Sequence, residues 1–84
     1  MEKTIYTDEY AAVLRLLREA REEAGLTQVD LAEKLGQSQS FVSKLERGDR
    51  RIDIVQLRTL CHTYGLTLSS FVERWEQALA KKRR

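Results

Sequence analysis

The 84-residue sequence contains no proline and only one cysteine, and it has no long apolar run. A single cysteine, Cys61, excludes a disulfide within the chain and suits a reducing compartment. No stretch approaches the roughly 20 apolar residues that a membrane-spanning helix needs, and residues 1–12 lack the apolar run of a secretory signal. These absences predict a cytoplasmic protein that does not bind a membrane.

The sequence also offers little for catalysis or cofactor binding. His62 is the only histidine, and it falls opposite the apolar stripe of its expected helix. Cys61 has no histidine or acid arranged as a partner, no residues have the spacing of metal ligands, and no glycine-rich phosphate loop is present. An enzyme is therefore the weakest interpretation, and we expect no cofactor, no metal and no small-molecule ligand.

Charge is distributed unevenly along the chain, although its net value is only +2. Acidic residues outnumber basic ones in residues 1–24. Residues 44–51 reverse this balance, because Lys44 and three arginines face only Glu46 and Asp49, and the chain then ends in KKRR. Positive charge gathered on and after one segment indicates contact with nucleic acid.

Apolar residues recur at three- and four-residue steps through most of the chain, which predicts amphipathic helices. The expected helices are 8–24, 28–35, 39–47, 54–64 and 68–80. Their expected N-caps are Asp8, Thr27, Ser38, Asp53 and Thr67. We expect one all-α domain over residues 1–84, because a chain of this length can bury only one small core.

The two ends of the chain have no clear periodicity. Residues 1–7 are expected either to be disordered or to lay Ile5 and Tyr6 against a neighbour. The basic residues 81–84 are expected to form a disordered tail that adds non-specific attraction to DNA.

The helices expected at 28–35 and 39–47 are joined by a turn of only two or three residues. Gly36 tolerates the positive φ that such a turn needs, and Ser38 can cap the second helix. Ala32 is small enough for the two helices to cross closely. This is the helix-turn-helix arrangement, in which the second helix lies in the major groove of DNA.

Two opposite charges fall on inward-facing stripes. Arg21 lies four residues after Leu17, and Glu46 lies four residues after Val42. An unpaired charge in these positions would be costly, so we predict a partly buried ion pair between Arg21 and Glu46. The alternative is two independent surface charges.

Residues 25–71 closely resemble the phage-repressor and Cro-like (Xre) helix-turn-helix family. The resemblance is carried by GLTQ, LAEKLG, SQSFVSKLERG and YGLTLSSF in combination. It implies a five-helix, lambda-repressor-like DNA-binding domain. It also implies that Arg21 and Glu46 match a structural ion pair present in some relatives.

The resemblance further implies where DNA is contacted. The matching base-contact positions are Gln39, Ser40, Ser43 and Lys44. The matching backbone-contact positions are Gln28, Arg47 and Arg50. Arg51 is either a further phosphate contact or a solvated loop charge. The chemistry agrees, because a glutamine amide fits adenine N6 and N7, whereas Lys44 suits guanine or a phosphate equally. The alternative for each polar residue is an ordinary solvated helix face.

These features predict a sequence-specific regulator that binds double-stranded DNA and either represses or activates transcription. A homodimer on a pseudo-palindromic operator is expected, with half-sites roughly 34 Å apart. In the last helix, we expect Leu68, Phe71 and Val72 in the core and Trp75 with Leu79 in the dimer interface. The alternative is that Trp75 and Leu79 also complete the monomer core. The second functional hypothesis is a protein-interaction module of the same fold, such as an antitoxin-like partner or an anti-repressor.

Overall fold

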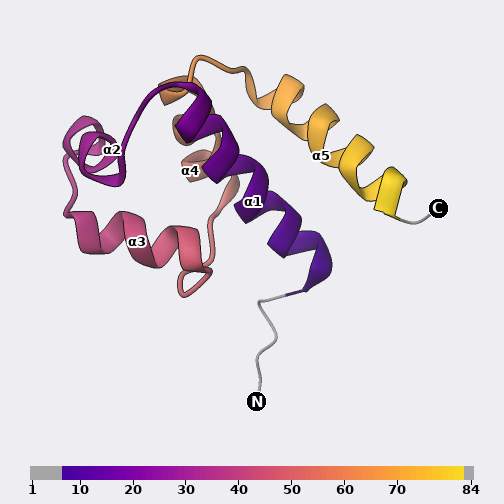
Figure 1. The fold of residues 1–84 in the computed structure, drawn as a ribbon, viewed down its shortest axis with the longest axis horizontal. Helices are drawn as coiled ribbons and strands as arrows, with labels where there is room; N and C mark the ends of the chain where they lie inside the picture. Colours follow the sequence, from indigo (N-terminus) through magenta and orange to yellow (C-terminus); the bar gives the residue numbers. More distant parts are fainter. Residues whose placement is uncertain (1–6, 83–84) are drawn as a thin grey trace.

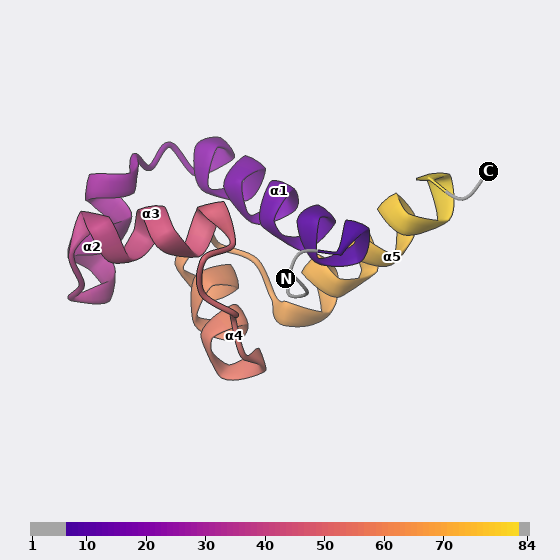
Figure 2. The same ribbon diagram turned by 90° about the horizontal axis from the view of Figure 1, so that it is seen from below.

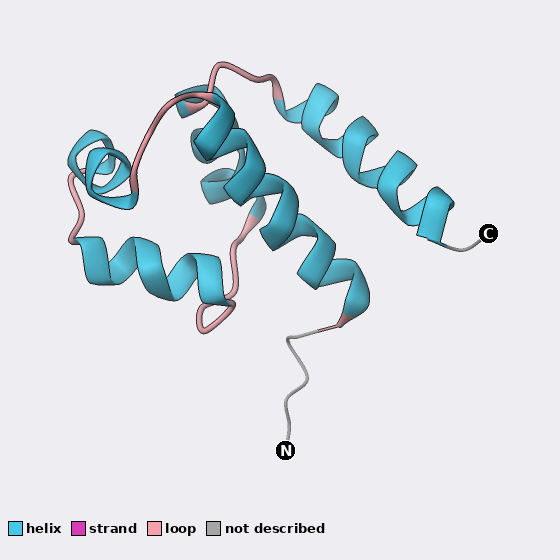
Figure 3. Ribbon diagram, viewed as in Figure 1, coloured by secondary structure: helices cyan, strands magenta, loops and turns pink. Residues whose placement is uncertain are grey.

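The computed structural model describes residues 7–82, and this part of the chain forms five helices and no strand. The helices are α1 (Asp8–Glu23), α2 (Gln28–Leu35), α3 (Gln39–Arg47), α4 (Ile54–Thr63) and α5 (Leu68–Lys82). Only helices joined by loops are drawn for these residues in Figure 3. The predicted all-α, five-helix fold is confirmed.

Helix α1 is the centre of the arrangement, since it packs against α3, α4 and α5. In Figure 1, α2 and α3 lie together at one end of the molecule, and α5 runs along α1 toward the C-terminus. The view turned by 90° shows α4 projecting beneath α1, between the α2–α3 pair and α5 (Figure 2). The helix-turn-helix segment is therefore held at one end of a scaffold made by the other three helices.

The ends of three helices differ from the predicted ends. Thr7, not Asp8, caps α1, because its hydroxyl accepts a hydrogen bond from the Tyr10 amide at 3.0 Å. Asp8 instead lies in the first turn, where a carboxylate complements the helix dipole. Helices α1 and α4 end one residue early, at Glu23 and Thr63, and α5 continues to Lys82.

The continuation of α5 corrects the prediction that the basic tail begins at residue 81. Residues 81 and 82 are helical. Residues 1–6 and 83–84 lie outside the described part of the chain, so the expected behaviour of the arm and of the last two arginines stays a prediction. No helix of the described chain is long and apolar enough to cross a membrane.

The core brings together one apolar face from each helix. Its buried members include Leu17 and Ala20 of α1, and the cluster is completed by Val13, Leu16, Leu31, Ala32, Val42, Leu60, Cys61, Tyr64 and Phe71. The apolar period of α4 predicts that Ile54 faces inward, but it is 68% exposed. Ile52, which lies in the preceding loop, packs against the core together with Leu57. These two side chains take the inward position that the pattern assigns to Ile54.

Candidate nucleic-acid interface

The turn between α2 and α3 fixes the direction in which α3 leaves it. Gly36 adopts the left-handed conformation with φ of +68°, and the Gln37 amide donates to the Ala32 carbonyl at 2.9 Å. Ser38 then caps α3 by accepting from the Phe41 amide at 3.1 Å. These local bonds bring Gln39 to the first position of α3.

Helix α3 has an inner face that is buried and an outer face that is exposed. Val42 and Leu45 are buried, while Gln39, Ser40 and Lys44 are exposed. Ser43 is half-buried beside them. Positions 39, 40, 43 and 44 share one side of a helix, so the structure brings the four predicted base-contact residues together. Within residues 7–82, the side chains of Gln39, Ser40 and Lys44 form no hydrogen bond or ion pair, which leaves their polar groups available to a partner.

Three arginines follow on the last turn of α3 and in the loop after it, and each has a contact in the free protein. Arg47 donates to the Asp49 carboxylate at 2.7 Å and to the Ser43 hydroxyl at 3.0 Å. Arg50 lies over the Phe41 ring, with 4.8 Å from its guanidinium carbon to the ring centroid. Arg51 lies over the Tyr10 ring at 5.3 Å.

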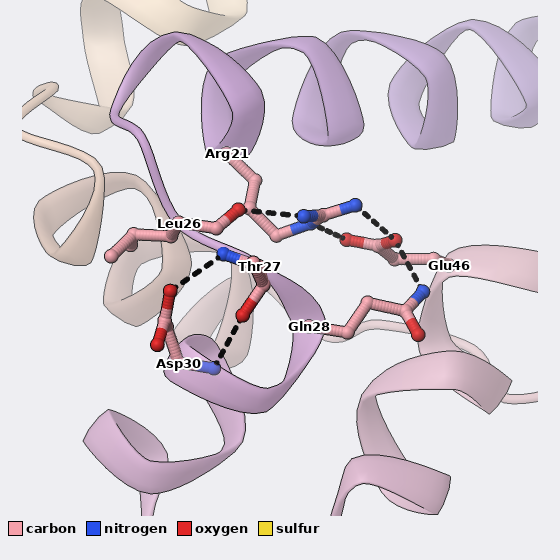
Figure 4. A network of polar contacts seen from close by, with 6 residues as sticks. All are labelled: Arg21, Leu26, Thr27, Gln28, Asp30 and Glu46. Atoms are coloured by element: carbon pink, nitrogen blue, oxygen red, sulfur yellow. Dashed lines mark hydrogen bonds and ion pairs between the residues drawn. The ribbon is translucent and has the colours of Figure 1, made fainter.

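Arg21 and Glu46 form the ion pair expected from the sequence, and Figure 4 shows it between α1 and α3. Arg21 Nε donates to Glu46 Oε2 at 2.7 Å and Nη2 donates to Oε1 at 3.2 Å. A third donor, Nη1, reaches the Leu26 carbonyl at 2.7 Å. Despite its burial, Arg21 has its pKa raised, because the hydrogen bonding to Glu46 outweighs desolvation.

Gln28 belongs to the same network. Its amide nitrogen donates to Glu46 Oε1 at 2.9 Å (Figure 4). The side chain is half-buried, although the amphipathic pattern of residues 28–35 predicts that Gln28 lies on an exposed first turn. A glutamine amide has two hydrogens, so a second donor remains after the bond to Glu46.

Tyr10 and Trp75 make three hydrogen bonds that were not predicted from the sequence. The Tyr10 hydroxyl donates to the Arg50 carbonyl at 3.2 Å and accepts from the Ile52 amide at 3.0 Å. The Trp75 indole donates to the Glu9 carbonyl at 3.0 Å. Trp75 was expected in a dimer interface, and no local pattern specified where the polar atoms of either ring would point.

The two residues expected in a dimer interface lie differently. Trp75 is half-buried and packs against the core. Leu79, one turn further along α5, is half-buried and is not among the residues that pack against the core cluster. The most exposed large apolar side chains of the described chain are Ile54 and Val55, at 68% and 71%.

The described residues contain neither a cluster of metal-binding side chains nor an exposed thiol. Among residues 7–82, no group of three or more histidine, cysteine or acidic residues could hold a metal ion. Cys61 is buried in the core, and burial raises the pKa of its thiol.

Comparisons with known proteins agree with this geometry. A family model described as helix-turn-helix matches residues 17–71. The HTH-type transcriptional regulator DdrOP3 of Deinococcus deserti is 39% identical over 57 residues. Those residues are 68% of this chain but 44% of the relative, so this chain spans less than half of that protein's length.

Two solved structures are similar over most of the chain. An XRE-family like protein from Pseudomonas syringae pv. tomato has a TM-score of 0.77 and 41% identity, and the match covers 83% of this chain and 85% of the other. The clp gene regulator ClgR from Corynebacterium glutamicum has a TM-score of 0.73 and 28% identity, with 86% and 77% covered.

Proposed function

The chain belongs to the Xre-type helix-turn-helix family, and we propose on this basis that it is a sequence-specific DNA-binding transcriptional regulator. The observation that carries the proposal is the outer face of α3, where three polar side chains have no partner within residues 7–82. Lys44 gives this face one positive charge, and Arg47, Arg50 and Arg51 follow on the last turn of α3 and in the loop after it. Short polar groups beside cations suit base edges flanked by phosphates.

Gln39 and Ser40 are the proposed base-reading residues of the first turn of α3. The Gln39 amide nitrogen can donate to adenine N7 while its oxygen accepts from N6, so both of its polar atoms pair with one base. Ser43 and Lys44 occupy the next turn and reach the following bases. Ser43 accepts a hydrogen bond from Arg47, and its own hydroxyl hydrogen can still donate to an acceptor on a base edge.

Gln28, Arg47, Arg50 and Arg51 are the proposed backbone contacts. Arg47 can donate to a phosphate with N–H groups that Asp49 and Ser43 leave unused, or it can exchange Asp49 for the phosphate. The exchange costs little, because an exposed ion pair contributes at most about 1 kcal/mol. Gln28 can keep its bond to Glu46 and use its second amide hydrogen on a phosphate. The network around Arg21 therefore fixes α2 against α3 while the outer surface binds.

We propose that two copies bind a pseudo-palindromic operator. Helix α3 has nine residues, about 13.5 Å of helix, so one domain reads only one segment of major groove. Two recognition helices roughly 34 Å apart would read adjacent turns on the same side of the duplex. Trp75 and Leu79 on α5 remain the proposed interface.

Base reading is tested by selecting bound sites from random DNA and then measuring affinity for the selected operator. Gln39→Ala should weaken binding by about 5- to 150-fold and relax preference at one base position. Gln77→Ala, which removes an exposed amide from α5, is the matched control and should bind as the wild type does. If Gln39→Ala keeps both affinity and sequence preference, Gln39 is not a reader.

The dimer is tested by sedimentation at increasing protein concentration, with and without operator. Leu79→Ser is the informative variant, because Trp75→Ala would also remove the hydrogen bond to Glu9 and loosen the monomer. Leu79→Ser should raise the dimer dissociation constant, whereas Ile54→Ser serves as an exposed apolar control. A wild type that stays monomeric at high micromolar concentration and binds DNA as one copy would refute the dimer.

The second hypothesis, a protein-interaction module of the same fold, makes a different prediction about salt. DNA binding through four or more phosphate contacts should weaken steeply with added salt, at a slope of about −0.9 per contact. No measurable binding to any DNA at low salt would favour the protein partner. The unpartnered polar groups of Gln39, Ser40 and Lys44 favour DNA.

A further inference from the structure

We propose that Tyr10 of α1 is a positioning residue for the DNA-backbone contacts: its hydroxyl anchors the loop that presents Arg50 and Arg51. The proposal rests on the function proposed above and adds a residue outside the helix-turn-helix to it. Tyr10 itself is half-buried and packs against the core, so its role is to hold the loop and not to touch DNA.

The hydroxyl of Tyr10 bridges the loop on both sides of Arg51. It donates to the carbonyl of Arg50 at 3.2 Å and accepts from the amide of Ile52 at 3.0 Å. The ring of the same tyrosine lies under the Arg51 guanidinium, at 5.3 Å. One side chain therefore contacts the backbone before and after Arg51 and also the Arg51 side chain.

The loop has little else to fix its backbone. The Gly48 and Asp49 amides close the end of α3, and the Leu57 amide bonds to Asp53 at the start of α4. Between these points, Arg50, Arg51 and Ile52 make no backbone–backbone hydrogen bond within the described chain. The Tyr10 hydroxyl supplies the missing partners for the Arg50 carbonyl and the Ile52 amide.

The two arginines thus contact aromatic rings of two different helices. Phe41 of α3 lies under Arg50, while Tyr10 of α1 lies under Arg51. A loop held in place keeps both cations where phosphates would meet them, so less conformational entropy is lost on binding. Without the hydroxyl, the loop must be ordered by DNA itself, and affinity falls.

Tyr10→Phe tests the proposal, since it removes both hydrogen bonds and keeps the ring. We expect binding to weaken by about 5- to 15-fold, to the operator and to unrelated DNA alike, because phosphate contacts carry no sequence information. The slope of log affinity against log salt should become shallower by about 0.9 for each phosphate that the variant no longer neutralises. A purely structural role would lower the melting temperature without changing this slope.

A double-mutant cycle gives the sharper readout. In an Arg50→Gln/Arg51→Gln background, adding Tyr10→Phe should change DNA affinity by less than about twofold, because the side chains that it positions are gone. Thr63→Val is the matched control: it removes a hydroxyl bonded at 2.8 Å to the Thr59 carbonyl at the far end of α4. It should leave affinity and salt slope unchanged.

The rate of hydrogen exchange at the Ile52 amide reports its hydrogen bond to the Tyr10 hydroxyl in the absence of DNA. This rate should be higher in Tyr10→Phe. The proposal is overturned if Tyr10→Phe keeps the wild-type affinity and salt slope while folded, or if its effect persists in full without the two arginines. A wild type that binds no DNA overturns the proposed function and this proposal together. If the wild type binds DNA and Tyr10→Phe binds it with the same affinity and salt slope, only the proposed role of Tyr10 is overturned.

Discussion

Replacing Arg21 with methionine is expected to lower the free energy of unfolding by about 3–5 kcal/mol. The Arg21 and Glu46 side chains are 9% and 11% exposed, so water cannot replace the missing partner. Glu46 loses the bonds at 2.7 and 3.2 Å and keeps the Gln28 amide, while the Leu26 carbonyl loses its donor. The cost comes mainly from leaving a charged carboxylate with one remaining hydrogen bond.

This loss would be a large part of the stability of the domain. A chain of 84 residues is expected to have about 4–13 kcal/mol in total. A loss of about 3 kcal/mol corresponds to a fall in melting temperature of about 12–24 °C at this size. Urea unfolding followed by helical circular dichroism measures it, with the dependence on denaturant concentration expected to stay unchanged.

The double-mutant cycle separates an ion pair from two independent charges. Arg21→Met/Glu46→Leu should destabilise much less than the sum of the two single changes, because the double variant leaves no buried charge. Arg15→Met is the control, since Arg15 and Glu19 form an exposed pair, 56% and 46% exposed, and should contribute about 0.5 kcal/mol or less. An Arg21→Met variant no less stable than Arg15→Met would refute the reasoning.

Three further predictions concern local features. Hydrogen bonds with Thr27 lower the pKa of Asp30, so the stability that its carboxylate contributes is present above its unfolded-state pKa and is lost as pH falls through the lower folded-state pKa. Asp30→Asn should therefore flatten the decline of urea midpoints below about pH 4. Burial raises the pKa of Tyr64, so the pH dependence of stability has the opposite sign: the stability that the neutral phenol contributes is present below about pH 10 and is lost as pH rises further. Tyr64→Phe should therefore resist alkaline unfolding better than the wild type. Gly36→Ala should cost about 1–2 kcal/mol in urea unfolding through its φ of +68° alone, because an added Cβ meets no atom within 4 Å; a neutral result would exclude backbone strain at this turn.

The parts of the fold that depend on local spacing could be predicted from the sequence. The apolar period, the caps and Gly36 specify where helices form, and the family resemblance covers the helix-turn-helix. The position of Arg21 on an inward stripe, four residues after Leu17, was enough to require a partner, and Glu46 was the matching charge. These inferences needed only neighbours within a turn of helix and the cost of burying a charge.

Contacts between distant segments could not be predicted in this way. The pattern of α2 places Gln28 on an exposed first turn, and it does not reveal that Glu46 Oε1 lies 2.9 Å from the Gln28 amide nitrogen. The two bonds of the Tyr10 hydroxyl depend on the path of a loop far along the chain, and Ile54 faces solvent because Ile52 takes the inward place. The DNA contacts themselves involve atoms of a partner, so they stay predictions.

The Trp75 indole that donates to the Glu9 carbonyl belongs to the only tryptophan of the chain. Its fluorescence therefore reports one event, the separation of α5 from the first turn of α1, while circular dichroism reports all helices at once. Coincident transitions by the two methods would mean that α5 unfolds with the rest of the domain. An earlier fluorescence transition would mean that α5 separates first, leaving the helix-turn-helix on a four-helix remainder.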